Sequence, residues 1–312
     1  MVDNASDDGS YESLLRLISQ GLVNRVKVLR SPVNSGYAGG NNLGYKHLDP
    51  SVKYFALMNN DFVLFPGVLE ALVSILEKNP RIGAIQGQIL GDNQRVNSGF
   101  HMNEILEGIP IRQKGPTHEV AYTSGSFSAY RREVVRRIER EGLLFSPRTF
   151  AYLDDNFLGL KLWEAGYKCV CADIEAGYHK SLGSFGGRLW FQFYLSNRAW
   201  LALLTASNSR YRVFELLTAG RLAFIGILRV FVNRDPMEFL YALRAWIDGI
   251  RLGKELVVDR GRVAIYAAPI QSTSPTQIVF AIIWEETLRL IERLRRRTPL
   301  APPKERAQHV VD

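Results

Sequence analysis

The sequence predicts an α/β protein: a mixed, mostly parallel, Rossmann-type sheet flanked by helices, followed by a helical C-terminal region. Over residues 1–188, short apolar runs of strand length alternate with segments of helical spacing, which is the order of a doubly wound sheet. Some of these runs end in polar residues, and open α/β sheets bind ligands at the carboxyl ends of their strands. From Leu189 onward the chain becomes apolar, aromatic and basic, which marks the second region.

The composition is that of a folded globular protein. Of the 312 residues, 46% are hydrophobic and 22% are charged, which excludes a disordered chain. The net charge of +8 belongs to the C-terminal region, because residues 189–312 hold 18 Lys and Arg against 11 Asp and Glu, whereas residues 1–188 hold 21 against 20. We expect no nucleic-acid binding, since this charge lies on apolar helices without a recognition motif. Cys169 and Cys171 lie two apart in a predicted strand and are poorly placed to bridge each other, which fits a reducing compartment.

The first predicted unit is the end of a strand, a helix and a second strand. The first two residues end a strand before a polar loop, a serine can cap a helix over 11–20, and residues 26–29 form the next strand. A Gly- and Asn-rich loop over 34–44 then leads into a helix that ends near Leu48. Such a loop lets the backbone approach a ligand closely, and its amides favour an anion. The same composition is also common in ordinary turns.

A strand and the polar turn after it form the centre of the prediction. Residues 52–58 are a nearly continuous apolar run, the pattern of a strand buried on both faces, and they end in Asn59-Asn60-Asp61. Asn59 and Asp61 point the same way in an extended backbone, and two oxygen-bearing side chains can hold a hard divalent cation. A polar turn that caps the helix beginning near Pro66 is the alternative interpretation.

The rest of the first region continues the alternation. Its predicted elements are a helix over 66–78, strands over 82–89, 127–130 and 168–172, a basic helix with a solvated face over 131–140 and a helix over 152–166, with 91–120 irregular. The last helix begins with Asp154 and Asp155, which favour the helix dipole, but two adjacent carboxylates exceed what a cap requires. His179 follows the last strand in a loop at the same edge as Asp61 and is a candidate metal ligand.

Six motifs stand in one order in the first region. They are Val2-Asp3-Asn4-Ala5-Ser6-x-Asp8-Gly9-Ser10, Asn34-x-Gly36-x-x-Gly39-x-Asn41, Asn59-Asn60-Asp61, Thr123-Ser124-Gly125 through Arg131-Arg132-Glu133, Asp154-Asp155 ahead of Leu160-x-Leu-x-x-Ala165-Gly166-Tyr167, and His179. With these motifs the chain resembles the family 2 glycosyltransferases of the GT-A fold, especially the rhamnosyltransferase-like members. The resemblance covers residues 1–188.

The resemblance implies roles for these residues. Asn59, Asp61 and His179 would bind a divalent cation, Mg²⁺ or Mn²⁺, together with the diphosphate of a sugar donor. Asp155 would be the catalytic base, with Asp154 beside it in the catalytic pair. The residues implied to bind the nucleotide sugar, beginning with a nucleobase contact from the first of them, are Asp3, Asn4, Ser6, Asn34, Gly39, Asn41, Asn60 and Gly125.

Two departures from the family pattern bear on function. Asn59 stands where the family has a carboxylate, which lowers the metal affinity that we expect. Gln192, Arg198 and Trp200 do not have the spacing of the Gln-x-x-Arg-Trp motif of processive members. A single-addition enzyme is therefore expected.

The resemblance also implies a strand that the sequence does not supply. In the family a βα unit precedes the residue matched by Asp3, and its strand lies between the strands that end at Asp3 and at Asp61. Only Met1 and Val2 precede Asp3 here. Without that strand, buried backbone groups would lack partners, at ~1–3 kcal/mol each. We therefore expect an N-terminally shortened form with an incomplete sheet near Asp3, which is unstable or weakly active.

The chemistry of the residues agrees with the resemblance. Sugar transfer needs a base that accepts the proton of the acceptor hydroxyl as it attacks the anomeric carbon, and a carboxylate suits this role. One base on the face opposite the leaving group implies inversion. We predict transfer of a hexosyl or deoxyhexosyl group from a nucleotide-diphosphate sugar to a hydroxyl of a lipid-linked or cell-surface glycan. The alternatives are an inactive binding or scaffold protein of the same fold and a sugar nucleotidyltransferase.

The C-terminal region is predicted to be helical over 189–298, with a flexible tail over 299–312. Residues 214–232 are about long enough to span a bilayer, but their arginines favour an interfacial or core helix. With the amphipathic segments 237–252 and 278–297, they indicate contact with an anionic membrane surface. We expect a peripheral enzyme at the cytoplasmic, inner face of the cell membrane that serves cell-surface polysaccharide biosynthesis. A packed subdomain or an oligomer interface is the alternative.

Overall fold

The fold was described from a computed structural model. The residues it describes are 1–92, 95–180, 189–214, 223–228, 230, 237–272, 274 and 276. Four predicted features lie wholly or mostly outside these residues. They are the Gly- and Ser-rich stretch over 181–187, the helix over 214–232, the basic segment over 278–297 and the tail over 299–312.

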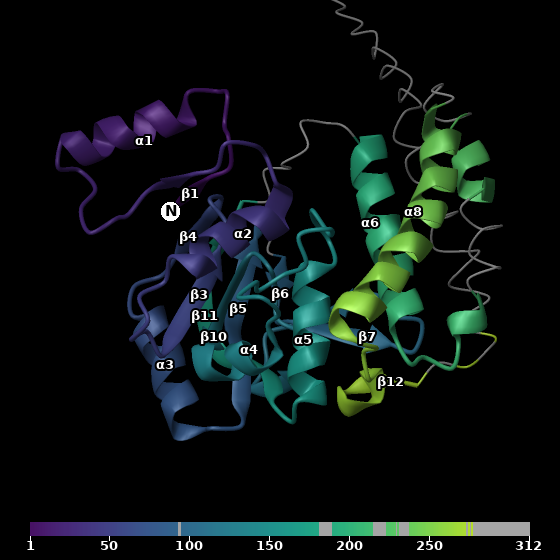
Figure 1. Cartoon of the computed structure of the whole chain (residues 1–312). Coiled ribbons are helices and arrows are strands. Elements are labelled where there is room, and N and C mark those ends of the chain that lie inside the picture. The colour runs from purple at the N-terminus through teal and green to yellow at the C-terminus, as the bar shows by residue number, and fades with distance from the viewer. Residues whose placement is uncertain are drawn as a thin grey trace, which may run out of the picture.

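A seven-stranded mixed sheet forms the centre of the first region (Figure 1). Its main path is β3 (Tyr54–Met58), β10 (Phe127–Arg131), β5 (Ile82–Gly91), β11 (Lys168–His179) and β4 (Phe62–Leu64), with β6 (Val96–Asn97) on β5 and β9 (His118–Val120) on β11. Among the described pairs of this sheet, β5 and β11 alone are parallel. Strands β3, β5 and β11 nevertheless run in one direction, because β10 lies antiparallel between β3 and β5. The predicted parallel character therefore holds for the direction of these strands and not for most of the pairings.

Helices cover both faces of this sheet. They are α2 (Gly36–Lys46), α3 (Val68–Lys78), α4 (Arg132–Ile138) and α5 (Asp154–Glu164). Leu72 of α3 packs with Ile85 of β5 in one cluster, whereas Leu162 of α5 packs with Ala84 of the same strand in another. Because adjacent residues of a strand point to opposite faces, the two clusters lie on opposite sides of the sheet. The predicted α/β class with flanking helices is confirmed.

The N-terminal strands form a sheet of their own. β1 (Val2–Asp3) pairs in parallel with β2 (Leu29–Arg30), and α1 (Ser10–Ser19) lies outside them without a buried residue (Figure 1). In the described part of the chain, no strand pairs with β3 on the side away from β10. Strand β1, which contains Asp3, and strand β3, which precedes Asn59, thus belong to separate sheets.

Strand β3 differs from its prediction. Residues alternate in burial along it, with Phe55 and Leu57 buried and Ala56 and Met58 exposed. The exposed fraction of Met58 reaches 53%. The prediction of a strand buried on both faces is therefore wrong for β3. That pattern occurs instead in β5, where the residues from Ile82 to Ile89 are all buried.

Two other stretches also depart from the sequence prediction. Residues 91–120, expected to be irregular, contain β6, β7 (Phe100–Asn103), β8 (Gly108–Pro110) and β9. Residues 36–44, expected to be a loop, belong to α2. Of the strands in the first stretch, β9 pairs with the distant β11, and local composition does not reveal such a pairing.

The C-terminal region packs closely on the first. Helix α6 (Leu189–Ala206) lies against α8 (Met237–Arg260), as Figure 1 shows, and β12 (Ile270–Gln271) joins β7 in parallel. Leu153 and Phe157 of the first region share a buried cluster with Leu203 and Leu256. The two regions thus share one buried cluster. A domain boundary between residues 188 and 189 stays a prediction.

In the described part of the chain, none of the helices combines the length and the apolar character needed to span a bilayer. Contact with a membrane surface stays a prediction.

Candidate functional site

The Asn59-Asn60-Asp61 turn is short and joins β3 to β4. The Phe62 amide donates to the Asn59 carbonyl at 3.2 Å, which closes the turn. Strand β4 pairs antiparallel with β11, so that Phe62 stands opposite His179. As a result the His179 Nε2 atom lies 3.0 Å from Asp61 Oδ1. His179 is the last residue of β11, and the prediction that placed it in a loop after a shorter strand is wrong.

The residues predicted to bind a metal are partly brought together. The Asp61 and His179 side chains keep 14% and 24% of their surface exposed. Among the residues that the structure describes, no three His, Cys, Asp or Glu side chains gather at one point. One carboxylate, one imidazole and the neighbouring Asn59 carboxamide nevertheless fit a cation that takes its other ligands from substrate phosphates, as Mg²⁺ commonly does.

The second part of the site is the start of α5. Asp155 is partly exposed, and its Oδ2 atom accepts the Gly125 amide at 3.0 Å, while Oδ1 accepts the Asn156 amide at 3.0 Å. Burial raises the pKa of Asp155, and these two amides oppose the rise. Leu153 occupies the N-cap position without a side-chain cap. The Asp155 carboxylate therefore does more than cap a helix, because it holds the Gly125 loop.

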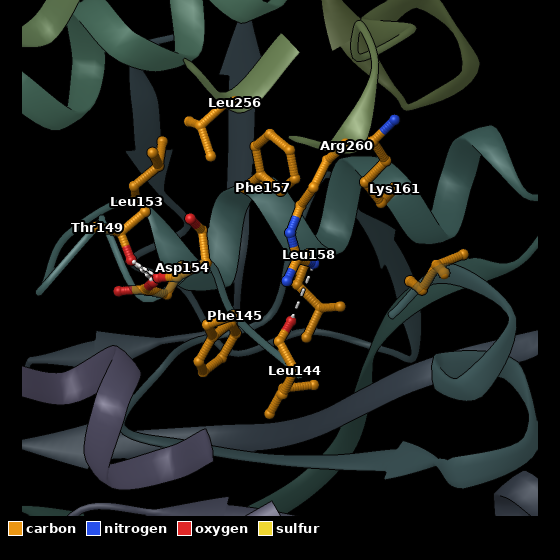
Figure 2. A pocket seen from close by; sticks show the side chains of 12 residues that line it. Leu144, Phe145, Thr149, Leu153, Asp154, Phe157, Leu158, Lys161, Leu256 and Arg260 are labelled. Carbon is orange, nitrogen blue, oxygen red and sulfur yellow. Dashed lines mark hydrogen bonds between the residues drawn. The ribbon is translucent and has the colours of Figure 1, made fainter. Parts of the chain in front are cut away.

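Asp154 lies in a different environment from its neighbour. It is 3% exposed, and burial raises its pKa to about 7. The Thr149 hydroxyl has a single hydrogen but lies against both the Ser146 carbonyl and the Asp154 carboxyl (Figure 2). A proton on Asp154 satisfies both contacts at once. The raised pKa favours the neutral form of Asp154 below about pH 7, so that two adjacent acids are not both charged there.

A small cavity lies beside Asp154, between α5 and α8 (Figure 2). Its volume is about 10 Å³, roughly the space that one water needs. Arg260 of α8 closes one side by donating to the Leu143 and Leu144 carbonyls. This cavity is too small for a nucleotide sugar, so the donor site lies elsewhere.

The Gly125-Ser126 segment connects the two parts of the site. The Gly125 amide holds Asp155, and the Ser126 carbonyl accepts the Asn59 amide at 2.9 Å. A Cβ atom on Gly125 would lie 3.2 Å from Asp155 Oδ2, tighter than ordinary packing. The absence of a side chain here permits the close approach of α5 to the loop.

The β1–α2 junction holds many of the residues predicted to bind the donor. Asn4 Oδ1 accepts from the Ser35 amide at 3.2 Å, and Asn4 Nδ2 donates to the Gly36 carbonyl at 2.8 Å and to Asn34 Oδ1 at 3.2 Å. Gly36 has φ +69°, and a Cβ there would lie 2.4 Å from the Phe150 carbonyl oxygen. The side chains of Asn4 and Asn34 thus fix the backbone at the start of α2.

The other predicted donor-binding residues have contacts of several kinds. Asp3 is 8% exposed and pairs with Arg30 at 3.3 Å. Its Oδ2 atom lies 3.4 Å from the Ser6 amide. Asn41 donates to the Tyr37 carbonyl at 2.9 Å, and Asn60 is exposed in its turn. A Cβ on Gly39 would lie 2.1 Å from Ser35 Oγ, so this glycine is required by packing within the helix start.

Sequence reasoning missed several residues of the site. The Tyr37 hydroxyl donates a hydrogen bond to the Gly125 carbonyl at 2.8 Å. Tyr37 lies inside the Asn34-x-Gly36-x-x-Gly39 motif, and this position could have marked it as a site residue. Arg198 of α6 donates to the Thr149 carbonyl. The sequence did not predict this contact, because it joins segments far apart in the chain.

The comparison with protein families bears on the first part of this site. Residues 1–139 match the model of glycosyl transferase family 2. The family 2 segment is somewhat less than half of the chain and includes Asn59, Asp61 and Gly125. Asp155 and His179 lie beyond it. The resemblance drawn from the motifs is thus confirmed for the family 2 segment, and its rhamnosyltransferase-like subtype stays a prediction.

The solved structures that are similar to this chain include the following two. The first is GalNAc-T7 with UDP, GalNAc and Mn²⁺, at 13% identity and a TM-score of 0.49, over 68% of this chain and 45% of that one. The chain thus spans less than half the length of that protein. The second is the mannosyltransferase PcManGT from Pyrobaculum calidifontis with GDP-Man and Mn²⁺, at 12% identity and a TM-score of 0.47, over 95% of this chain and 77% of that one.

Proposed function

We propose that the chain is an inverting glycosyltransferase that moves a hexosyl or deoxyhexosyl group from a nucleotide-diphosphate sugar to an acceptor hydroxyl. One observation carries the proposal: the Gly125-Ser126 segment binds Asp155 through one residue and the Asn59 turn through the next. This segment thereby connects Asp155, which is partly exposed, to the turn that carries Asp61. Asp61 in turn lies against His179. The family 2 match over residues 1–139 supports the same activity.

In the proposed reaction Asp155 is the base, because Asp154 is buried and Asp155 reaches the surface. The acceptor oxygen forms a bond to the anomeric carbon while its proton passes to Asp155. The bond from that carbon to the diphosphate oxygen breaks, and its electron pair leaves with the diphosphate. Attack from the opposite face inverts the configuration. The raised pKa makes Asp155 a stronger base than an exposed aspartate.

Asp61 and His179 would hold a divalent cation, Mg²⁺ or Mn²⁺, with the Asn59 carboxamide beside them. Such a cation, when bound, supplies positive charge for the departing diphosphate. The β1–α2 junction would form the wall on the nucleoside side. Because the Asn4 and Asn34 side chains are engaged with the backbone, this wall would act mainly through its shape and main-chain groups.

The proposed acceptor is a lipid-linked or cell-surface glycan, met at the cytoplasmic face of the membrane. Leu240 and Ile247 of α8 are 54% and 57% exposed, and Arg244 and Arg251 stand on the same face at helical spacing. Arginines between exposed aliphatic side chains suit an anionic lipid surface. Co-sedimentation of the full chain with lipid vesicles tests this location. We expect salt-sensitive sedimentation with phosphatidylserine vesicles and none with neutral vesicles.

The activity is tested with the full chain and a panel of nucleotide-diphosphate sugars, with and without Mn²⁺ or Mg²⁺. A short alcohol serves as the acceptor, and both nucleoside diphosphate and the anomeric configuration of the glycoside are measured. We expect cation-dependent turnover of one donor class with inversion. Asp61→Ala should weaken donor binding in the presence of cation. Asp49→Asn, an exposed carboxylate before the start of β3, is the matched control and should leave binding unchanged.

Other products would point to other functions. Pyrophosphate in place of nucleoside diphosphate identifies a sugar nucleotidyltransferase. Donor binding without turnover identifies an inactive binding protein. A glycoside with retained configuration contradicts the role proposed for Asp155, since a single base cannot produce it without a second displacement.

A further inference from the structure

We propose that Tyr37 is a positioning residue, which acts on the base Asp155 through the backbone of Gly125. This inference rests on the proposed function of Asp155 and adds a second residue to it. Tyr37 belongs to α2, Gly125 to the loop before β10, and Asp155 to the first turn of α5. Three segments that are far apart in the sequence therefore meet at one residue, Gly125.

The carbonyl and the amide of Gly125, which belong to the two peptide groups on either side of its Cα atom, are held by different side chains. The Tyr37 hydroxyl donates to the Gly125 carbonyl at 2.8 Å, and the Gly125 amide donates to Asp155 Oδ2 at 3.0 Å. A Cβ atom on Gly125 would lie 3.1 Å from the Tyr37 hydroxyl and 3.2 Å from Asp155 Oδ2. The side chains of Tyr37 and Asp155, from two different helices, thus both lie close to Gly125. The Tyr37 bond fixes the direction of the Gly125 carbonyl and so limits rotation about the Gly125 Cα atom, which helps to keep the Gly125 amide directed at the carboxylate.

Tyr37 is itself fixed in one direction. Its ring lies 5.7 Å from the ring of Phe145, centroid to centroid. The next residue, Ala38, donates its amide to the Phe150 carbonyl at 3.1 Å. Burial raises the pKa of Tyr37 well above its ordinary value, so the hydroxyl keeps its proton and acts as a donor. The packed ring and the bonded backbone leave the hydroxyl directed at the Gly125 carbonyl.

The groups around Asp155 decide the sign of the effect on pH dependence. Asp154 adjoins it on α5, Tyr37 faces it from α2, Tyr122 from the segment before Gly125, and Tyr130 from β10. Arg198 of α6 acts on the same pair of acids through Asp154. These tyrosines are all held neutral by burial. The Gly125 amide favours the charged form of Asp155, so weakening that bond raises the pKa of Asp155.

The test compares Tyr37→Phe with Tyr37→Leu, with Asp155→Asn and with Tyr45→Phe. The conservative variant keeps the ring on Phe145 and removes the hydroxyl, whereas Tyr37→Leu removes the ring packing too. Tyr45 lies further along α2 and packs on Phe55 at 5.2 Å, so Tyr45→Phe is the matched loss of a buried tyrosine hydroxyl. The readouts are kcat, KM for the donor, the pH profile of kcat and the melting temperature.

We expect Tyr37→Phe to lower kcat about fivefold, the effect of one hydrogen bond, with KM for the donor unchanged. The acidic limb of its kcat profile should move to higher pH by roughly half a unit. Tyr45→Phe should move neither. A merely structural Tyr37 would lower the melting temperature in both Tyr37 variants and leave the limb in place, and that result overturns the proposal.

The same set of variants separates the two levels of inference. If Asp155→Asn keeps its activity, the proposed base is wrong and the role of Tyr37 with it. If Asp155→Asn is inactive while Tyr37→Phe matches the unaltered protein in kcat and pH profile, only the role of Tyr37 is wrong.

Discussion

The two ends of the candidate site treat their polar groups in opposite ways. At the β1–α2 junction, Asn4 directs its side-chain oxygen and nitrogen to the backbone and side chains of residues 34–36. At the edge formed by β4, β11 and α5, Asp61 and Asp155 keep part of their surface open to solvent. A polar group that is satisfied within the protein holds the backbone in place. A carboxylate that is partly open can still exchange a proton or bind a ligand.

The largest expected effect concerns the open end. Asp155→Asn should lower kcat by ~10²–10⁴-fold, the usual contribution of a general base, while donor affinity stays within a few-fold. A base acts in the transition state and contributes little to ground-state binding. Steady-state kinetics and isothermal titration with the donor measure the two effects separately. A kcat near that of the unaltered protein removes Asp155 from the role of base.

The second effect concerns the satisfied end. Asn4→Ala should lower the free energy of unfolding by ~1–3 kcal/mol, because the Ser35 amide and the Gly36 carbonyl lose their partner. Urea denaturation measures this loss. Asn60→Ala, in an exposed turn, is the control and should leave stability unchanged. If Asn4→Ala is as stable as the unaltered protein but fails to bind the donor, Asn4 contacts the ligand and the comparison between the two ends is lost.

The smallest effect separates the two adjacent acids. The pKa of Asp154 is raised from 3.8 to about 7 in the folded protein, so the folded state binds this proton more tightly than the unfolded state. The stabilising effect of that proton is present at acidic pH and is lost as the pH rises toward 7. Asp154→Asn has no proton to lose.

Melting temperatures at pH 5 and pH 8 test this difference. The unaltered protein should lose more stability over that interval than Asp154→Asn does. Asp173→Asn, in the exposed part of β11, should show the same pH dependence as the unaltered protein. Parallel pH curves for Asp154→Asn and the unaltered protein would mean that Asp154 is already ionised at pH 5.

Local patterns in the sequence predict much of the fold but little of the contact geometry. The apolar run over 82–89 corresponds to β5, and the helical spacing over 66–78 corresponds to α3. Strand β4 has three residues and was not predicted, although it is what places His179 opposite Phe62. Three residues are too few to show the alternation of apolar and polar residues that indicates a strand. Strand β4 is defined by its pairing with β11.

By itself, the sequence determined the alternation of strands and helices and the polar residues that end β3 and begin α5. Both follow from local patterns, since apolar spacing and helix-capping composition act within a few residues. Only the tertiary structure decided that Asp154 is buried while Asp155 stays partly exposed, and that Tyr37 and Asp155 both bind the backbone of Gly125. Adjacent acids look alike in a sequence. Their difference comes from desolvation and hydrogen bonds supplied by α2, α6 and the Gly125 loop, which are brought together only by folding.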